Sequence, residues 1–251
     1  MRYKVFMENY IIKNIVGQDI VLNINDSTTE KGISNYPTVG NRITFIEEQQ
    51  KFFNELFSGF GDKKLTVLDI GSNGGIFSIY CAPICDKVYA IEPSAVLCRA
   101  IREFSSSNEN IVVCNCAISS NDGMIKFYFF PDCTGQSTIH SRGKAKKADP
   151  LTVSVNAYTI LSFIKKYKIE YVDICKIDIE GEEVNLFTEE TIDALSPYVD
   201  KFWVETHNTA HINGKEIRQN FEEMTWLFRN KGYMLSKCDD PEDYGFVARR
   251  A

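Results

Sequence analysis

Residues 67–93 carry the residue types and the spacing of a nucleotide-cofactor half-site. Asp69 ends a predicted strand, the turn Gly71–Gly75 follows it, and Glu92 ends a second predicted strand. A carboxylate at such a strand end can accept hydrogen bonds from both hydroxyls of a ribose. The order of strand, glycine turn, helix, strand and acid therefore predicts a site for an adenosine-containing cofactor.

The residues of the turn argue against a dinucleotide or a nucleoside triphosphate. A dinucleotide site has the pattern G-x-G-x-x-G, but here Gly71 is followed by Asn73 and Ile76 at the other two glycine positions. The Gly-Lys-Ser/Thr of a P-loop is also missing after the turn. Asp69 would repel a pyrophosphate and suits a cationic ligand. S-adenosylmethionine carries an ammonium and a sulfonium group and no phosphate, so the sequence favours it as the cofactor.

Four further polar residues stand at the ends of two later strands. Asp178 and Glu180 follow one predicted strand, and Glu205 and His207 follow the next. In an open α/β sheet, ligands bind outside the carboxyl ends of the strands. We therefore expect all four side chains to face the same crevice as the half-site.

These four residues can carry out acid–base chemistry. A sugar or alkyl hydroxyl is a poor nucleophile until its proton leaves, so methyl transfer to it needs a general base within hydrogen-bond reach. His207 titrates near neutral pH, which suits a base, and Glu205 or Asp178 could orient it or take the same role. We predict catalytic roles for His207, Glu205, Asp178 and Glu180.

The same four residues are also possible metal ligands, because carboxylates and imidazole bind Mg²⁺ or transition ions. His211 lies four residues after His207, but the residues between them disfavour a helix that would bring the two rings together. We predict that these residues bind no metal ion, and we keep a metal site as the alternative interpretation. We interpret Glu182 and Glu183 as acids in the first turn of a helix, and Lys176 as a packing or pairing residue of its strand.

The composition bounds the class of protein. The 251 residues suffice for one large α/β domain, and 28 basic against 34 acidic residues lack the electrostatic footprint of a nucleic-acid-binding protein. No apolar run approaches the about 20 residues of a membrane helix, and we expect no signal peptide, because the first residues lack its apolar stretch. The eight cysteines include no C-x-x-C pair. We predict a soluble, cytoplasmic protein with a small-molecule or glycan acceptor and without nucleic-acid or membrane partners.

Helical and strand patterns alternate along the chain, which predicts an α/β fold with a mostly parallel sheet and helices on both faces. An amphipathic helix is predicted over 43–57, and the polar residues 131–150 form either a substrate lid or a solvated loop. We expect a strand-rich extension over 1–42 and one domain over 43–251. Other strands are predicted at 10–12, 20–24, 111–116, 125–130, 151–155, 172–177 and 201–204, helices at 95–106, 158–167 and 217–228, and an antiparallel hairpin from 233–235 and 244–248.

Three motifs, in order, resemble those of the FkbM family of class I S-adenosylmethionine-dependent methyltransferases. The family pattern D-I-G-[AS]-N-x-G-x-[FY]-S stands here as Asp69–Ser78, K-I-D-[IV]-E-G-x-E as Lys176–Glu183, and E-x-H as Glu205–His207. The resemblance covers about residues 43–210. It implies a Rossmann-like fold with a seven-stranded sheet, and methyl transfer to a hydroxyl of a sugar, glycan or natural product.

The same resemblance implies where the cofactor binds. Asp69 and Gly71 would hold its methionine portion, Glu92 its ribose, and Asn115 and Ala117 would lie beside the adenine. Phe77 and Ser78 would begin the helix beneath it. The predicted cofactor-binding residues are Asp69, Gly71, Ser72, Asn73, Phe77, Ser78, Glu92, Pro93, Asn115, Cys116, Ala117 and Asp178.

Two other functions stay open, because the residues themselves do not specify the acceptor. An N- or carboxyl-methyltransferase acting on a small molecule would keep the fold and change the acceptor. A non-catalytic S-adenosylmethionine-binding module would keep only the cofactor site. The acids after both later strands argue against the module, because a pure scaffold does not need them.

Overall fold

The computed structural model describes residues 56–130, 134–141, 150–237 and 244–250, together with three short strands near the N-terminus. These strands, which pair antiparallel in sequence order, are β1 (Lys4–Val5), β2 (Tyr10–Ile15) and β3 (Gln18–Asn23). β2 and β3 confirm the two strands predicted at 10–12 and 20–24, and β1 was not predicted. Nearly all of the predicted helix over 43–57, and the domain boundary after residue 42, lie outside the described residues.

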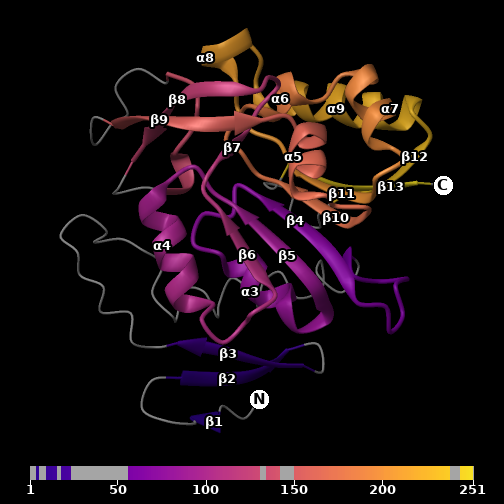
Figure 1. Cartoon of the computed structure of the whole chain (residues 1–251). Coiled ribbons are helices and arrows are strands. Elements are labelled where there is room, and N and C mark those ends of the chain that lie inside the picture. The colour runs from indigo at the N-terminus through magenta and orange to yellow at the C-terminus, as the bar shows by residue number, and fades with distance from the viewer. Residues whose placement is uncertain are drawn as a thin grey trace.

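A seven-stranded sheet lies at the centre of the fold (Figure 1). Its strands are β4 (Leu65–Ile70), β5 (Cys85–Ile91), β6 (Ile111–Cys114), β10 (Val172–Ile177), β11 (Val199–Glu205), β12 (Tyr233–Lys237) and β13 (Gly245–Arg250). They follow the order β12-β13-β11-β10-β4-β5-β6. The pairs from β11 to β6 are parallel, whereas β13 runs antiparallel to both β11 and β12. The predicted class I methyltransferase fold, with its antiparallel C-terminal hairpin, is confirmed.

The central strands bury side chains on both faces, because successive residues of a strand point to opposite sides. In β4, Leu68 and Ile70 belong to one hydrophobic core with Phe163 and Phe228, whereas Val67 belongs to the other core. Helices cover both faces, as predicted (Figure 1). The first core includes residues of α5 (Ile160–Tyr167), α6 (Glu183–Leu186), α7 (Glu189–Leu195) and α9 (Ile217–Asn230), and the second includes residues of α3 (Ile76–Cys81) and α4 (Ala95–Phe104).

A second, smaller sheet stands beside the carboxyl ends of the main strands. It has the order β7-β9-β8, from β7 (Ala117–Ile118), β8 (Gly123–Phe129) and β9 (Leu151–Tyr158). After β8, residues 134–141 fold back, because Thr138 pairs with Tyr128. Oε1 of Glu182 accepts hydrogen bonds from the Ser119 hydroxyl at 2.8 Å and the Ser120 amide at 2.9 Å. This contact fastens the small sheet next to the end of β10.

Two expectations from composition can be compared with the described residues. The six cysteines among them are buried and free, as core packing requires. No helix of the described part is both long and apolar enough to cross a bilayer.

Candidate active site

A cavity opens at the carboxyl ends of β4, β5 and β10. Of the predicted cofactor-binding residues, it is lined by Gly71, Asn73, Glu92, Pro93, Cys116, Ala117 and Asp178. The small sheet and the segment after β8 form another wall, with Ile118, Phe127, Thr134, Gly135, Ser137, Thr138 and Ile139. The part of 131–150 that is described therefore lies on the cavity, where a substrate lid would lie.

The other predicted cofactor-binding residues are absent from the lining of this cavity: Asp69, Ser72, Phe77, Ser78 and Asn115. Phe77 lies in the second core with its ring 5.3 Å from that of Trp203, because its helix turns this side chain toward the sheet. Asn115 donates to the carbonyls of Glu92 at 3.1 Å and Pro93 at 2.8 Å, so it fixes the end of β5. Phe77 and Ser78 stand near the start of α3, as expected, and the places of this helix and of Asn115 relative to the cofactor stay predictions.

Gly71 brings β4 and β10 close together at the edge of the cavity. Its φ is +76°, and a Cβ added there would lie 1.7 Å from the carbonyl oxygen of Asp178. The Asp178 amide in turn donates to the carbonyl of Ile70 at 3.1 Å. Only glycine permits this approach, which sets the separation between the glycine turn and the acids after β10.

Glu92 ends β5 with its carboxylate fixed by two backbone amides. Oε2 accepts from Asn73 at 3.0 Å, and Oε1 accepts from Ser94 at 2.8 Å. Because a carboxylate has about four acceptor sites, each oxygen keeps capacity for a ligand hydroxyl. Burial raises the pKa of Glu92 to about 8, although both amide donors act in the opposite direction. This geometry suits the two hydroxyls of a ribose.

Asp69 is fully buried and lies close to the ammonium group of Lys176. Its Oδ2 accepts from the Ser78 hydroxyl at 2.6 Å, and Nζ of Lys176 lies 3.5 Å from Oδ1. The same Nζ lies 3.1 Å from Oδ2 of Asp178, so one cation joins the two acids. Burial raises the pKa of Asp69, and the charge of Lys176 opposes this. The expectation that Lys176 pairs structurally is confirmed.

The turn after β4 also contains buried polar atoms without a hydrogen-bond partner among the described residues. They are Oδ1 of Asp69, Oγ of Ser72 and Oδ1 of Asn73. Buried polar atoms are normally hydrogen-bonded. Of these three residues only Asn73 lines the cavity, so its Oδ1 can accept a hydrogen bond from a ligand there, whereas Oδ1 of Asp69 lies 3.5 Å from Nζ of Lys176.

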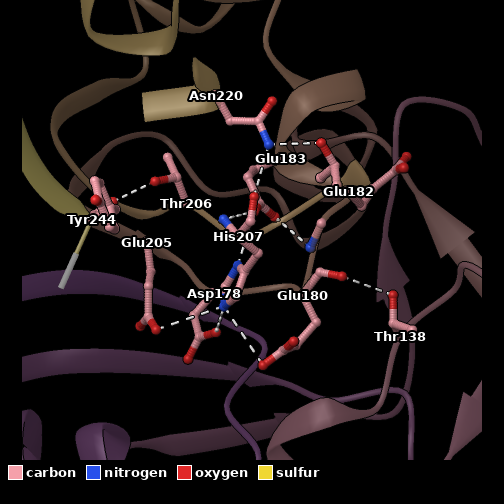
Figure 2. Close-up of polar contacts among 12 residues, drawn as sticks. Thr138, Asp178, Glu180, Glu182, Glu183, Glu205, Thr206, His207, Asn220 and Tyr244 are labelled. Atoms are coloured by element: carbon pink, nitrogen blue, oxygen red, sulfur yellow. Dashed lines mark hydrogen bonds and ion pairs between the residues drawn. The ribbon is translucent and has the colours of Figure 1, made fainter. Parts of the chain in front are cut away.

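A cluster of one imidazole and several carboxylates lies beside this cavity (Figure 2). Nε2 of His207 is 3.6 Å from Oδ1 of Asp178, 3.6 Å from Oε1 of Glu180 and 3.6 Å from Oε1 of Glu205. Nδ1 of the same ring is 2.8 Å from Oε1 of Glu183. The expectation that the residues after β10 and β11 meet in one place holds for all four catalytic candidates.

His207 differs from the expected near-neutral base. Burial alone would lower the pKa of its imidazole. The hydrogen bond with Glu183 and the charges of Glu183, Glu180 and Asp178 outweigh burial and raise the pKa to about 10. The ring is therefore an imidazolium at neutral pH in the ligand-free protein. This raised pKa differs from the near-neutral titration expected of His207, and which residue takes the proton stays a prediction.

Comparison of the sequence with models of known families identifies a methyltransferase domain over this site. The model of the methyltransferase FkbM domain matches residues 69–235, which is more than half of the chain. The chain belongs to the FkbM methyltransferase family. This membership makes S-adenosylmethionine the cofactor of the site. The acidic cavity fits it, because Glu92 can accept from the ribose, and Oδ1 of Asn73 and the carboxylate of Asp178 on the same cavity can receive the ammonium group.

Individual relatives of the FkbM domain are distant. The methyltransferase sdnD of Sordaria araneosa is 24% identical over 151 residues, which cover 48% of this chain and 58% of that relative, so the chain spans less than two thirds of its length. A solved methyltransferase FkbM from Methylobacillus flagellatus is 13% identical, with a TM-score of 0.45 over 74% of this chain and 43% of that one. The Methanococcus jannaschii fibrillarin pre-rRNA processing protein is 14% identical, with a TM-score of 0.48 over 99% and 97%.

Two acids of the FkbM domain have roles that the sequence analysis missed. Glu183 is fully buried, and it accepts from the backbone amides of His207 at 2.8 Å and Gly181 at 2.9 Å as well as holding the imidazole. Glu182 faces the other way, where its Oε2 lies 3.0 Å from Nε2 of His140. Burial would raise the pKa of Glu182, but hydrogen bonds from His140 and its other partners lower it to about 2. Both acids stand at the start of α6 as predicted, but they do more than favour the helix.

Proposed function

We propose that this FkbM domain transfers the methyl group of S-adenosylmethionine to a hydroxyl oxygen of a sugar, glycan or natural product. One observation carries the proposal. The carboxylates of Asp178 and Glu180 lie both on the cavity that Glu92 lines and beside the imidazole of His207. A group of proton acceptors therefore adjoins the cofactor site, as the deprotonation of a hydroxyl requires.

The chain's own residues hold and orient the reactants. Glu92 accepts the ribose hydroxyls, and Oδ1 of Asn73 and the carboxylate of Asp178 receive the ammonium group of the methionine portion. The cavity wall at Cys116 and Ala117 faces the adenine. When bound, S-adenosylmethionine supplies an electrophilic methyl group, and the C–S bond breaks toward sulfur as the O–C bond forms. Much of the rate then comes from holding the acceptor oxygen in line with that methyl group.

Glu205 takes the proton of the acceptor hydroxyl in this proposal. Its side chain is 38% exposed, against 29% for Asp178 and 19% for Glu180, so an incoming acceptor reaches it most readily. Asp178 is already paired with Lys176, and His207 is already protonated. The imidazolium lies 3.6 Å from the Glu205 carboxylate and holds it as an anion until the proton arrives.

A labelled-methyl assay tests the proposal. The protein is incubated with methyl-labelled S-adenosylmethionine and panels of sugars, glycans and hydroxylated natural products, and NMR locates the methyl group in each product. We expect an O-methyl ether. Glu205→Gln should lower turnover roughly 100-fold or more while leaving the calorimetric affinity for S-adenosylhomocysteine unchanged. The surface variant Glu222→Gln, on α9, serves as the matched control and should change neither.

Three results would contradict this function. A methyl group found on nitrogen or in an ester would assign the domain to N- or carboxyl-methylation. Cofactor binding with no turnover on any acceptor would favour a non-catalytic module. Absence of S-adenosylhomocysteine binding would refute the site itself.

A further inference from the structure

We propose that Asp178, Glu180 and His207 form a binding site for a divalent metal ion, which the sequence analysis had not expected. Their donor atoms all lie within 4.8 Å of one another, as they do for no other such group among the described residues. They come from the ends of two neighbouring parallel strands, β10 and β11. The site thus lies where ligands bind in open α/β sheets.

The distances between the donor atoms fit a shared ion better than direct hydrogen bonds. Nε2 of His207 lies 3.6 Å from the nearest oxygens of Asp178 and Glu180, which is beyond hydrogen-bond length. Two ligands about 2.1 Å from one ion, at a tetrahedral angle, lie about 3.4 Å apart. The carboxylate of Glu205, with an oxygen 3.6 Å from the same nitrogen, lies next to this ligand set and outside it.

Groups outside the ligand set orient the donors. Glu183 holds Nδ1 of His207 at 2.8 Å, which directs Nε2 toward the acids (Figure 2). Metal-bound histidines usually have such a carboxylate on their other ring nitrogen. Lys176 binds Oδ2 of Asp178 at 3.1 Å and leaves Oδ1 toward the cluster. The Thr138 hydroxyl donates to the backbone carbonyl of Glu180 at 3.0 Å. Each ligand residue is therefore positioned before an ion arrives, and the ion displaces the proton of His207 Nε2 to solvent as it binds.

The donor set indicates the class of ion. Imidazole together with carboxylates suits Mn²⁺, Fe²⁺ or Zn²⁺, whereas Mg²⁺ prefers sites made of oxygen alone. Three protein ligands leave coordination positions open for a substrate. Because Asp178 and Glu180 also line the cavity, those positions face the place of the acceptor.

If the domain methylates oxygen, as proposed above, a bound ion also indicates which acceptors it prefers. With three protein ligands, an ion that expands to five coordinates has two open positions, which an acceptor with two neighbouring oxygens fills best, such as a vicinal diol or a hydroxyl beside a carbonyl. An ion bound to the reacting hydroxyl lowers the pKa of that hydroxyl. Its proton then passes to Glu205, and the oxygen lone pair forms the new bond to the methyl carbon.

Metal binding can be measured without any turnover. The chelator-treated protein is titrated with Mn²⁺, and the free ion is followed by electron paramagnetic resonance. We expect one Mn²⁺ per chain and a rise in the melting temperature with Mn²⁺ concentration. Glu180→Gln and Asp178→Asn should abolish binding, and Glu183→Gln should weaken it roughly 10- to 100-fold. Glu170→Gln, an exposed acid outside the site, is the matched control and should bind like the wild type.

The outcomes separate this inference from the proposed function. Failure of the wild-type protein to bind Mn²⁺, or equal binding by Glu180→Gln, overturns the metal site even if O-methylation is found. Stoichiometric binding that Glu180→Gln abolishes supports the site, even if the methyl group proves to be on nitrogen. Faster methylation of a vicinal diol than of its monodeoxy analogue, lost after chelation and restored by Mn²⁺, supports the acceptor class.

Discussion

Lowering the pH should weaken cofactor binding through Glu92. This carboxylate lines the cavity and is 4% exposed, and burial raises its pKa to about 8. Only the ionised form can accept hydrogen bonds from both ribose hydroxyls, because a protonated carboxyl uses one oxygen as a donor. Since the pKa of this acid is raised, the binding-competent carboxylate is gained as the pH rises and lost as it falls through about 8.

The size of the effect follows from the ionised fraction. The apparent dissociation constant equals the intrinsic constant divided by the fraction of protein in the competent state. That fraction is close to one at about pH 9 and roughly one tenth at about pH 7. We therefore expect the affinity for S-adenosylhomocysteine to fall about tenfold over this range, or about 1.4 kcal/mol.

Isothermal titration calorimetry with S-adenosylhomocysteine measures this dependence, because the demethylated cofactor allows no turnover. Glu92→Gln is the control variant, since it keeps the size of the side chain and removes the ionisation. Its binding should be weaker and should lose the tenfold change. A flat profile for the wild type, or the same slope in Glu92→Gln, refutes the reasoning.

Three further predictions concern stability and can be checked by chemical and thermal denaturation. Gly71→Ala should abolish folding or lower the free energy of unfolding by several times the roughly 1–2 kcal/mol expected for Gly214→Ala. Both glycines have φ +76°, but of the two only Gly71 would place its Cβ against another backbone. Equal losses in the two variants would contradict this. Lys176→Met should lower the free energy of unfolding by about 3–5 kcal/mol, because it leaves the buried carboxylate of Asp69 without its cation. The double variant with Asp69→Asn should recover most of this loss. If it recovers none, the ion pair does not stabilise the fold. Phe228→Ala, in the first core, should cost roughly 3–5 kcal/mol, and a cost below 1 kcal/mol would be unexpected on the same scale.

The half-site and the central strands could be predicted from the sequence because their signals are local. Asp69, the glycine turn and Glu92 lie within 24 residues of one another, and their order alone implies strand, turn, helix and strand. The predicted strand over 172–177 agrees with β10 at both ends, and all six residues are buried although Asp173 and Lys176 interrupt the apolar ones. The meeting of the acids after β10 and β11 then follows from parallel pairing.

The remaining features depend on contacts that a linear pattern does not encode. Alternation predicts that β8 and β9 are strands, but the pattern does not say that they pair with β7 away from the main sheet. Glu183 is the last acid of the motif Lys176–Glu183, but an acid there suits both the first turn of a helix and the support of a distant imidazole, so the sequence did not show its contact with His207. The pKa of His207 is set by acids that precede it by more than 20 residues, and only the fold brings them together.

Because β8 pairs with β9, the segment that joins them could be replaced by another without changing the rest of the fold. Phe129 and Leu151 are direct cross-strand partners, so the segment between them begins and ends at the same place on the small sheet. Its length is therefore not constrained by the main sheet, and each doubling of a loop costs only about 0.6 kcal/mol in closure entropy. Five residues of this segment line the cavity, namely Thr134, Gly135, Ser137, Thr138 and Ile139. We therefore expect that replacing the segment with that of a relative changes which acceptors the cavity admits. Glu92 and the ends of β10 and β11 would keep their places.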